Sequence, residues 1–442
     1  MSLPRLLVGS LPQRKRAAWL LVVAVIGPVS LPRAHAEPIT WGGGTGSYST
    51  GANWVGGVAP TASNQVVIAA GTAQISGADG GFARAAATTI SGGRLELSNL
   101  RFRNAEGGPA TFEITSGSLV QTGSTYFLVG HNNAGVFNQS GGTVAPTLSR
   151  GFFTSDGAGS SGVYNLTGGS LTVTMNGSYN TDLHNVQIGR NSGSDRFLVN
   201  GGTATFNNTA ASPTDRRFYI FRDAEFEVRT GVANVDNFHY FVVGRNTAAG
   251  ATSKAIFSGG TTSIAVRDSF ILNAGTNARV DVSGGSLSIS QVGGSGGHLV
   301  IGDRSDGLSL FHHTGGIVTV AGDVLLNRVA NATLESARYV MDGGELEARD
   351  ILRSNPNGLF TLSQGTIRLT LGTDRRGILD EPWFVLPPGT TATASFNGGV
   401  TTIVAVPEPA GWVLLAVGSA GAAVVRRRVP RCRADRIEAI SG

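Results

Sequence analysis

The sequence predicts an all-β protein, a right-handed parallel β-helix (β-solenoid) of about eleven coils. Short β-branched and aromatic runs bounded by glycine recur throughout residues 37–405, and no stretch keeps the apolar period of about 3.6 residues that marks a helix. One glycine recurs eleven times between Gly93 and Gly365, at a mean spacing of about 27 residues. A fixed period of this length is typical of a solenoid, in which each repeat forms one coil.

Apolar residues recur at fixed distances from the repeated glycine. The residue two positions after it is mostly aliphatic, and an apolar phrase such as Phe241-Val242-Val243-Gly244 follows in several copies. We therefore expect about three short strands per coil, stacked about 4.8 Å apart, with glycines at the bends and an aromatic ladder inside. Of the residues five positions before the last ten glycines, eight are aromatic: Phe112, Phe137, Tyr164, Phe197, Phe226, Phe311, Tyr339 and Phe360.

The first 36 residues have the order of a secretory signal peptide. Arg14-Lys15-Arg16 precedes an apolar stretch over residues 17–26, and Ala34-His35-Ala36 follows as a small-x-small cleavage motif. We predict that residues 1–36 are the signal peptide and that signal peptidase cleaves after Ala36, with Ala34 and Ala36 as its recognition residues.

Residues 37–80 differ from the repeats and contain Trp41, Trp54 and several glycines before a short apolar run. A solenoid needs a terminal segment that covers its exposed edge. We therefore predict an N-terminal cap over residues 37–80, β-solenoid repeats over 81–370, and a C-terminal cap and linker over 371–404. This opening resembles that of β-solenoid surface proteins with autotransporter-type strand repeats. Stacking of the two tryptophans on sugar rings is an alternative to capping.

Residues 405–428 have three parts in a fixed order. A turn-forming Val406-Pro407-Glu408-Pro409 precedes an apolar run over residues 410–425, and Arg426-Arg427-Arg428 ends it. A Pro-Glu-Pro turn cannot belong to a helix, because each proline fixes φ and lacks an N–H, so a membrane helix must begin after it. The arginines then orient the far end of that helix toward the cytoplasm. Residues 429–442 are then a cytoplasmic basic tail.

This order closely resembles the PEP-CTERM sorting signal of bacterial surface proteins. The resemblance implies that a membrane-embedded exosortase recognises Val406, Pro407, Glu408, Pro409 and the three arginines. It also implies a protein held in the inner membrane before processing, and located on the cell surface or outside the cell afterwards. In this family such proteins are linked with exopolysaccharide and biofilm formation.

The charge of the chain belongs largely to the two targeting segments. Without them, 23 basic and 26 acidic residues remain, a net charge of about −3. No clustered positive charge survives, which argues against nucleic acid as a partner. The single cysteine, Cys432, lies in the cytoplasmic tail, so the exported part has no disulfide and no thiolate chemistry.

Carboxylates are the candidates for enzymatic chemistry, because β-helix folds include polysaccharide lyases and hydrolases. Side chains two residues apart on a strand share a face, which places Glu225 beside Glu227 and Glu345 beside Glu347. Such pairs are usually a solvated strand face, so we predict no catalytic residues. The groups considered are Asp303 with Asp306, Asp223 with Glu225 and Glu227, and Asp342 with Glu345 and Glu347.

Histidines and the longest insertion give weaker signals. His312 and His313 are adjacent on a predicted strand and must point to opposite faces, so they cannot easily share a metal. Four others, His131, His184, His239 and His298, are expected to be surface histidines, and we predict no metal and no cofactor. The insertion near residues 203–222 carries the pair Arg216-Arg217, for which a solvated loop is favoured over a binding loop.

These features predict a non-enzymatic exported protein with a structural or adhesive role at the cell surface or in the extracellular matrix. Its expected partners are signal peptidase, exosortase, the membrane before processing, and exopolysaccharide or another matrix component. A polysaccharide lyase or glycoside hydrolase built on the same β-helix is the alternative.

Overall fold

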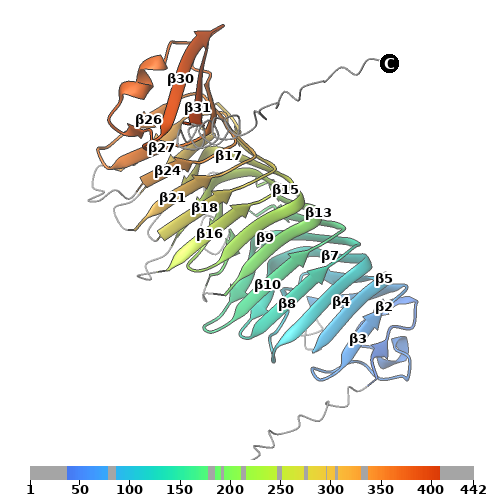
Figure 1. Ribbon diagram of the computed structural model, residues 1–442. Helices are drawn as coiled ribbons and strands as arrows, with labels where there is room; N and C mark the ends of the chain where they lie inside the picture. The colour runs from blue at the N-terminus through green and yellow to red at the C-terminus, as the bar shows by residue number, and fades with distance from the viewer. Residues whose placement is uncertain are drawn as a thin grey trace, which may run out of the picture. The chain divides into compact units, whose positions relative to one another are not determined.

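A computed structural model shows the stack of β-coils that the repeat predicts. It describes residues 37–408, except for 78–85, 178–184, 191–193, 211–215, 246–250, 273–276, 295, 304–306 and 330–336 and the side chain of Ser124. Within these residues, 31 strands join into one continuous sheet that winds around a buried core as a β-solenoid of the right-handed type (Figure 1). The all-β fold of about eleven coils is therefore confirmed.

Each coil has three faces, which are named here by their strands. Face A carries the strand before the repeated glycine, and its members pair in parallel with the equivalent strand of the next coil. In order these are β1 (Ile39–Thr40), β3 (Gln65–Ile68), the first parts of β5 (Ala87–Ser98) and β7 (Ala110–His131), β8 (Ala134–Gln139), β10 (Ser161–Leu166), the first parts of β13 (Arg196–Asn208) and β15 (Glu225–Val243), β16 (Thr252–Phe257), β18 (Asn277–Val282), β21 (Ser309–His313), β24 (Ala337–Met341), β27 (Gly358–Leu362) and β29 (Phe384–Val385).

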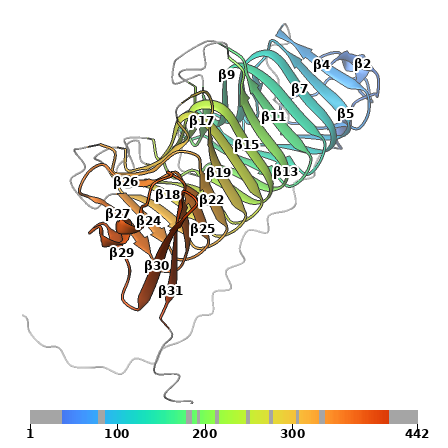
Figure 2. The ribbon, with the colours of Figure 1, turned by 90° about the horizontal axis from the view of Figure 1, so that it is seen from above.

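Face B carries the strand that follows the glycine, and Figure 2 shows its strands side by side from β11 to β25. It comprises β2 (Thr45–Ser47), β4 (Thr72–Ser76), later parts of β5, β7, β13 and β15, the first parts of β9 (Thr143–Asp156) and β17 (Thr261–Leu272), β11 (Ser170–Met175), β19 (Ser286–Gln291), β22 (Ile317–Val320), β25 (Glu345–Ala348) and β28 (Gly365–Leu369).

Face C carries the third apolar phrase of each repeat. It comprises β6 (Phe102–Arg103), the last parts of β7, β9, β15 and β17, β12 (Val186–Ile188), β14 (Arg217–Ile220), β20 (His298–Ile301), β23 (Val324–Leu326) and β26 (Ile351–Arg353). Two short 3-10 helices, η1 (Gly51–Asn53) and η3 (Arg376–Asp380), belong to the terminal segments.

The repeated glycines form a column at the bend between faces A and B. Ten of the eleven have a positive φ, Gly93 being the exception, so a side chain at these positions is strained. They are also crowded, because a Cβ atom on any glycine from Gly117 to Gly365 would overlap the carbonyl oxygen of the glycine one coil earlier. That carbonyl accepts a hydrogen bond from the next coil, as from Thr203 N–H to Gly169 O at 3.0 Å. The bend therefore needs glycine for two reasons: the backbone has a positive φ, and the preceding coil leaves no room for a Cβ atom.

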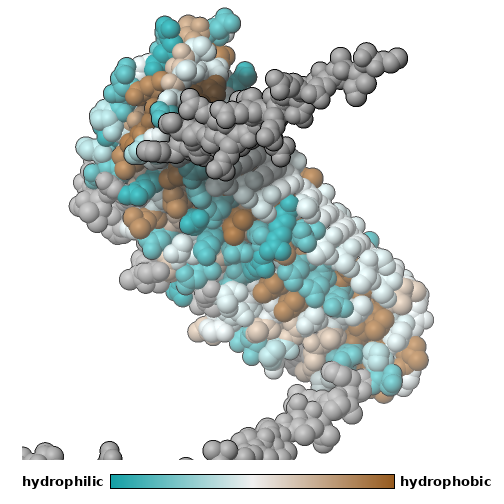
Figure 3. Space-filling model, in the orientation of Figure 1, coloured by the Kyte–Doolittle hydropathy of each residue, from teal (hydrophilic) through white to brown (hydrophobic). Residues whose placement is uncertain are grey.

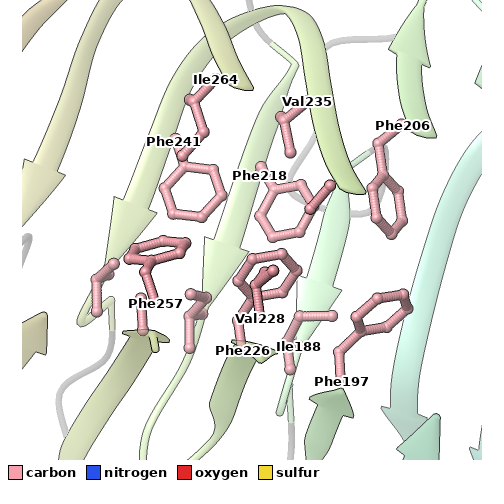
Figure 4. Close-up of a cluster of buried hydrophobic side chains, with 14 of the residues drawn as sticks. Ile188, Phe197, Phe206, Phe218, Phe226, Val228, Val235, Phe241, Phe257 and Ile264 are labelled. Atoms are coloured by element: carbon pink, nitrogen blue, oxygen red, sulfur yellow. The ribbon is translucent and has the colours of Figure 1, made fainter. Parts of the chain in front are cut away.

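The predicted aromatic ladder fills the core. On face A the rings of Phe112, Phe137, Tyr164, Phe197 and Phe226 stack with centroids 4.6 to 5.7 Å apart. The ladder is interrupted in the next coil, where Ala255 takes the aromatic position. Phe257, two residues on, packs edge-on against Phe226 at 6.3 Å and occupies the freed space (Figure 4).

Two tyrosines in this ladder bring a hydroxyl group into the core, and each finds a partner in the preceding coil. The Tyr164 hydroxyl donates to Gln139 Oε1 at 2.6 Å, and the Tyr339 hydroxyl lies 3.0 Å from His313 Nδ1. Gln139 and His313 both stand two residues after a ladder aromatic, where most coils have an aliphatic residue. A buried hydroxyl needs a partner, so the polar residues at this position accompany the tyrosines.

The N-terminal segment continues the stack. β1 and β2 pair in parallel with β3 and β4, which pair with β5 in turn. Trp54 packs edge-on against Trp41 and Tyr48, with ring centroids 5.0 and 4.8 Å away. Both tryptophans are only 3% exposed, so the alternative of sugar stacking on their rings is wrong for this conformation.

The C-terminal segment changes the direction of pairing. β31 (Val400–Pro407) runs antiparallel to β28 and to β30 (Thr390–Asn397), and this hairpin lies at the end of the stack (Figure 1). β31 includes the first residues of the predicted sorting signal: Val406 and Pro407 pair with Thr391 and Thr390, and Glu408 N–H donates to Gly389 O at 2.7 Å.

The remaining parts of the targeting segments lie outside the described residues. These parts are the signal peptide with Ala34 and Ala36, and the C-terminal stretch with Pro409, Arg426, Arg427, Arg428 and Cys432. Within the described part of residues 37–408, no helix is long and apolar enough to cross a bilayer. The signal peptide and the sorting helix therefore stay predictions.

Two glycine substitutions separate the two demands of the bend. Gly285 and Gly293 both have positive φ, but only Gly285 is crowded, since nothing lies within 4 Å of a Cβ on Gly293. We expect Gly293→Ala to lower the free energy of unfolding by about 1 kcal/mol, the strain of the left-handed backbone. Gly285→Ala should lower it clearly more, as measured by chemical denaturation. Equal losses would contradict a role for the carbonyl contact.

His313 gives a pH dependence with a defined sign. Burial lowers the pKa of His313, so the folded protein holds the neutral ring while the unfolded chain binds a proton near pH 6.5. Its contribution to stability is complete above about pH 6.5 and is lost as the pH falls toward the lowered pKa. His313→Gln keeps an acceptor for Tyr339, as Gln139 does for Tyr164, and removes the titration.

The measurement is the melting temperature of the wild type and of His313→Gln at pH 7.5 and 5. The variant should lose less stability than the wild type over this interval. An identical loss in both proteins would show that His313 does not titrate between the two states.

Candidate functional site

A band of charged side chains crosses face A in the middle of the stack. Arg196, Glu225, Lys254 and Arg279 occupy equivalent outward positions in four successive coils, because their strands pair in this register. The parallel ladder therefore sets charges of both signs beside one another at the strand spacing of about 4.8 Å. Figure 3 shows hydrophilic residues gathered on this face.

An open groove of about 660 Å³ lies within this band. Among the described residues, the Lys254 ammonium has no carboxylate within ion-pair distance, whereas Arg279 Nε lies 2.7 and 2.9 Å from the two oxygens of Asp281. The hydrogen bond that Arg279 donates to Asp281 raises the pKa of Arg279, so the guanidinium stays charged. The groove is lined by Asp223, Glu225, Thr252, Lys254, Ile256, Arg279 and Asp281.

In the predicted group of Asp223, Glu225 and Glu227, the two glutamates lie on one face and are neutralised by arginine, whereas Asp223 Oδ1 accepts a hydrogen bond from Thr252 N–H at 2.8 Å. Glu225 and Glu227 both contact Arg196, with Arg196 Nε 3.0 Å from Glu225 Oε1, and Arg229 Nε lies 2.5 Å from Glu227. Burial by itself raises the pKa of Glu227, but the hydrogen bonds from Arg229 and Arg196 outweigh it and lower the pKa. Glu227 is therefore held ionised and is poorly suited to donate a proton.

The second group is divided between two faces. Asp342 Oδ2 lies 3.0 Å from His312 Nε2 at the end of face A, whereas Glu347 pairs with Arg368 at 3.6 Å on face B, where Glu345 also lies. In the third group Asp303 accepts a hydrogen bond from Arg328 Nε at 2.7 Å, and Asp306 lies outside the described residues. Neither group provides a described pair of free carboxylates.

The histidines behave as the alternation predicts. His312 points outward between Asp281 and Asp342, and His313 points into the core. His131, His239 and His298 each lie 3.7 to 4.0 Å from a different aspartate, and His184 lies outside the described residues. Among the residues that the structure describes, no three histidine, cysteine or acidic side chains are placed to hold a metal ion.

The prediction of a solvated loop at Arg216 is wrong. Its side chain is 1% exposed, and the guanidinium donates to Ser149 O and Arg150 O, both at 3.0 Å, and to Gly177 O. Burial lowers the pKa of Arg216 to about 10, so it remains protonated at neutral pH. One buried cation thus satisfies carbonyl groups of earlier coils, and its neighbour Arg217 is only half-buried.

Face B has a feature that the sequence analysis missed. Its two outward positions after the glycine bend carry small hydroxyl or amide side chains in coil after coil, and none is charged over the middle of the stack. We call these the hydroxyl columns. The first contains Ser118, Thr143, Ser170, Thr203, Thr261 and Ser286, interrupted by Val232, and the second contains Thr172, Thr205, Asn234, Ser263 and Ser288.

The hydroxyl columns are partly exposed and regular. Neighbouring members of a column are paired residues of adjacent strands, and the Ser170 and Thr143 hydroxyls are 3.4 Å apart. Toward both ends of the stack these positions become charged, with Arg94 and Glu96 in an early coil and Glu345 in a late one. In Figure 3, pale rows of intermediate hydropathy run beside the charged band of face A. The signal in the sequence was the Ser or Thr directly after many of the repeated glycines.

The chain matches no protein-family model, and no curated protein or solved structure matches it either. The functional argument therefore depends on the geometry of faces A and B.

Arg216 and Arg217 form a matched pair for substitution. Arg216→Met should lower the free energy of unfolding by about 3 kcal/mol, because it leaves buried carbonyl groups without donors. Arg217→Met should cost less than about 1 kcal/mol, since a half-buried side chain can be replaced with little loss. Chemical denaturation of both variants measures the difference. Similar losses in the two would contradict the structural role of Arg216.

Proposed function

We propose that this protein is an exported structural component of the cell surface or extracellular matrix, and that face B binds exopolysaccharide. The observation that carries the proposal is the pair of hydroxyl columns. Serine and threonine hydroxyls both donate and accept hydrogen bonds, as sugar hydroxyls do. A repeated surface of this kind offers many equivalent weak contacts to a repeated polymer, and their sum gives avidity.

The targeting part of the proposal depends on the sequence. A signal peptide over residues 1–36 directs export and is removed by signal peptidase after Ala36, and an exosortase processes the chain near Val406, Pro407, Glu408 and Pro409. Its support is the order of the motif, the apolar run and the three arginines. The last strand of the hairpin ends at Pro407, so the predicted membrane helix would begin directly after the folded part.

A polysaccharide lyase or hydrolase remains the second candidate because of the groove on face A. Lys254 lines the groove with Asp223 and Glu225 and has no ion-pair partner among the described residues, and such a cation is suited to the carboxylate of an acidic sugar. Two features weigh against it: Glu227 is held ionised, and Asp281 is occupied by Arg279. A general acid and a general base are not evident among the described residues of the groove.

Light scattering coupled to size-exclusion chromatography distinguishes the two functions. The full chain, purified in detergent, is mixed with exopolysaccharide from the host, and the polymer mass is measured over time. We expect co-elution at unchanged polymer mass, which supports a binding protein. A falling polymer mass would establish a depolymerase, and separate elution would contradict polysaccharide binding.

Two variants assign the binding face. The double variant Thr205→Glu/Ser263→Glu places two charges in the second hydroxyl column. It should reduce co-elution by about tenfold or more, because a bound polymer would bury these carboxylates without a partner. Lys254→Glu, a charge change on face A, should leave it unchanged. The opposite pattern would place the binding surface in the groove of face A.

A further inference from the structure

Among the described residues, the stack of coils ends in a strand whose outer edge pairs with no other strand. β30 pairs with β31 alone among the described strands, and it is the outermost strand of the C-terminal hairpin (Figure 1). Its burial pattern is exposed or half-buried along its whole length. The outer edge of β30 is therefore a row of backbone groups available for pairing.

The hairpin geometry identifies these backbone groups. Gly398 and Gly399 form a two-residue loop, so the flanking pair Asn397 and Val400 is hydrogen-bonded and the bonding alternates along the strand. The N–H and C=O groups of Ala392, Ala394 and Phe396 consequently point away from β31. The N–H of Thr390 is already used, since it donates to Pro387 O at 3.1 Å.

β30 carries no charge, proline or bulge, which are three of the features that usually block edge pairing. Its eight residues include no charged residue and no proline, and its pairing with β31 runs without a register shift. The other end of the stack is different, because β1 and β2 have only two and three residues and lie beside the buried tryptophans. Among the described strands, only the C-terminal end therefore offers a long edge.

We propose that β30 pairs with β30 of a second copy of this chain, antiparallel and across a two-fold axis. Such an arrangement is isologous, so it closes at two copies and leaves no further edge of this kind. A two-fold axis at Thr393 overlaps residues 390–396 and places Ala392 opposite Ala394, with their free backbone groups facing each other. The neutral Thr-Ala alternation is self-complementary, so no like charges meet in this register.

The pairing joins two solenoids end to end at their C-terminal hairpins. Each dimer then presents two copies of face B. If face B binds polysaccharide as proposed above, the dimer cross-links two polymer strands, but the pairing itself does not depend on that function.

Cysteine cross-linking in the full chain tests the register. In a Cys432→Ser background, Thr393→Cys places the two cysteines opposite each other at a pair without interstrand hydrogen bonds between the copies, where the Cα atoms are about 4.5 Å apart. We expect a disulfide-linked dimer on a non-reducing gel after mild oxidation. Thr402→Cys is the control. It lies on β31, opposite Ser395 of β30, so β30 separates it from the second copy and it should not cross-link.

A second substitution separates pairing from folding. Ala394→Pro removes an N–H that points away from β31, so the hairpin keeps its own hydrogen bonds and the circular dichroism spectrum should be unchanged. Combined with Thr393→Cys, it should reduce the cross-linked fraction about tenfold. No dimer from Thr393→Cys, or a yield that Ala394→Pro leaves unchanged, would overturn the proposal.

Discussion

The close approach of successive coils at the glycine bend is the constraint on which this structure depends. From Gly117 to Gly365 each glycine sits against the carbonyl oxygen of its predecessor, and that carbonyl bonds to the following coil. The bend thereby fixes both the distance and the register between coils. Equivalent side chains are then superimposed, which stacks the aromatics inside and sets outward residues in columns. Faces A and B follow from the same geometry with different outward residues.

The inward half of this pattern could be predicted from the sequence, because it repeats at fixed distances from each glycine. The ladder from Phe112 to Phe360 was found in this way, and so was the opposite orientation of His312 and His313. The tyrosine partners could also have been found, since Gln139 and His313 are polar residues at an apolar position one repeat earlier. Their signal lies about 26 residues away, where only the repeat alignment makes it visible.

The outward contacts, and the contacts of side chains that follow the loops, could not be predicted from the sequence. Arg196 reaches Glu225 and Glu227 across one coil, and Arg216 reaches carbonyl groups more than 60 residues earlier. The repeats vary in length because their loops do, and the loops determine which of these side chains meet. Contacts of this kind therefore do not recur at a fixed spacing in the sequence. The repeat also did not predict that β31 ends inside the sorting motif. Antiparallel pairing with β28 and β30 replaces the parallel repeat there.

The two outward faces offer different chemistry to a polymer. The charges of Arg196, Glu225, Arg279 and Asp281 on face A are compensated by a neighbour in the same or the next coil, whereas face B exposes neutral hydroxyl groups over its central coils. Contacts between charges are screened by salt, and hydrogen bonds between hydroxyl groups are nearly insensitive to it. The affinity of the full chain for exopolysaccharide, measured by calorimetry at low and high ionic strength, therefore tests the account most directly. Recognition by face B predicts an affinity that changes little with salt, and a steep loss of affinity at high salt would contradict it.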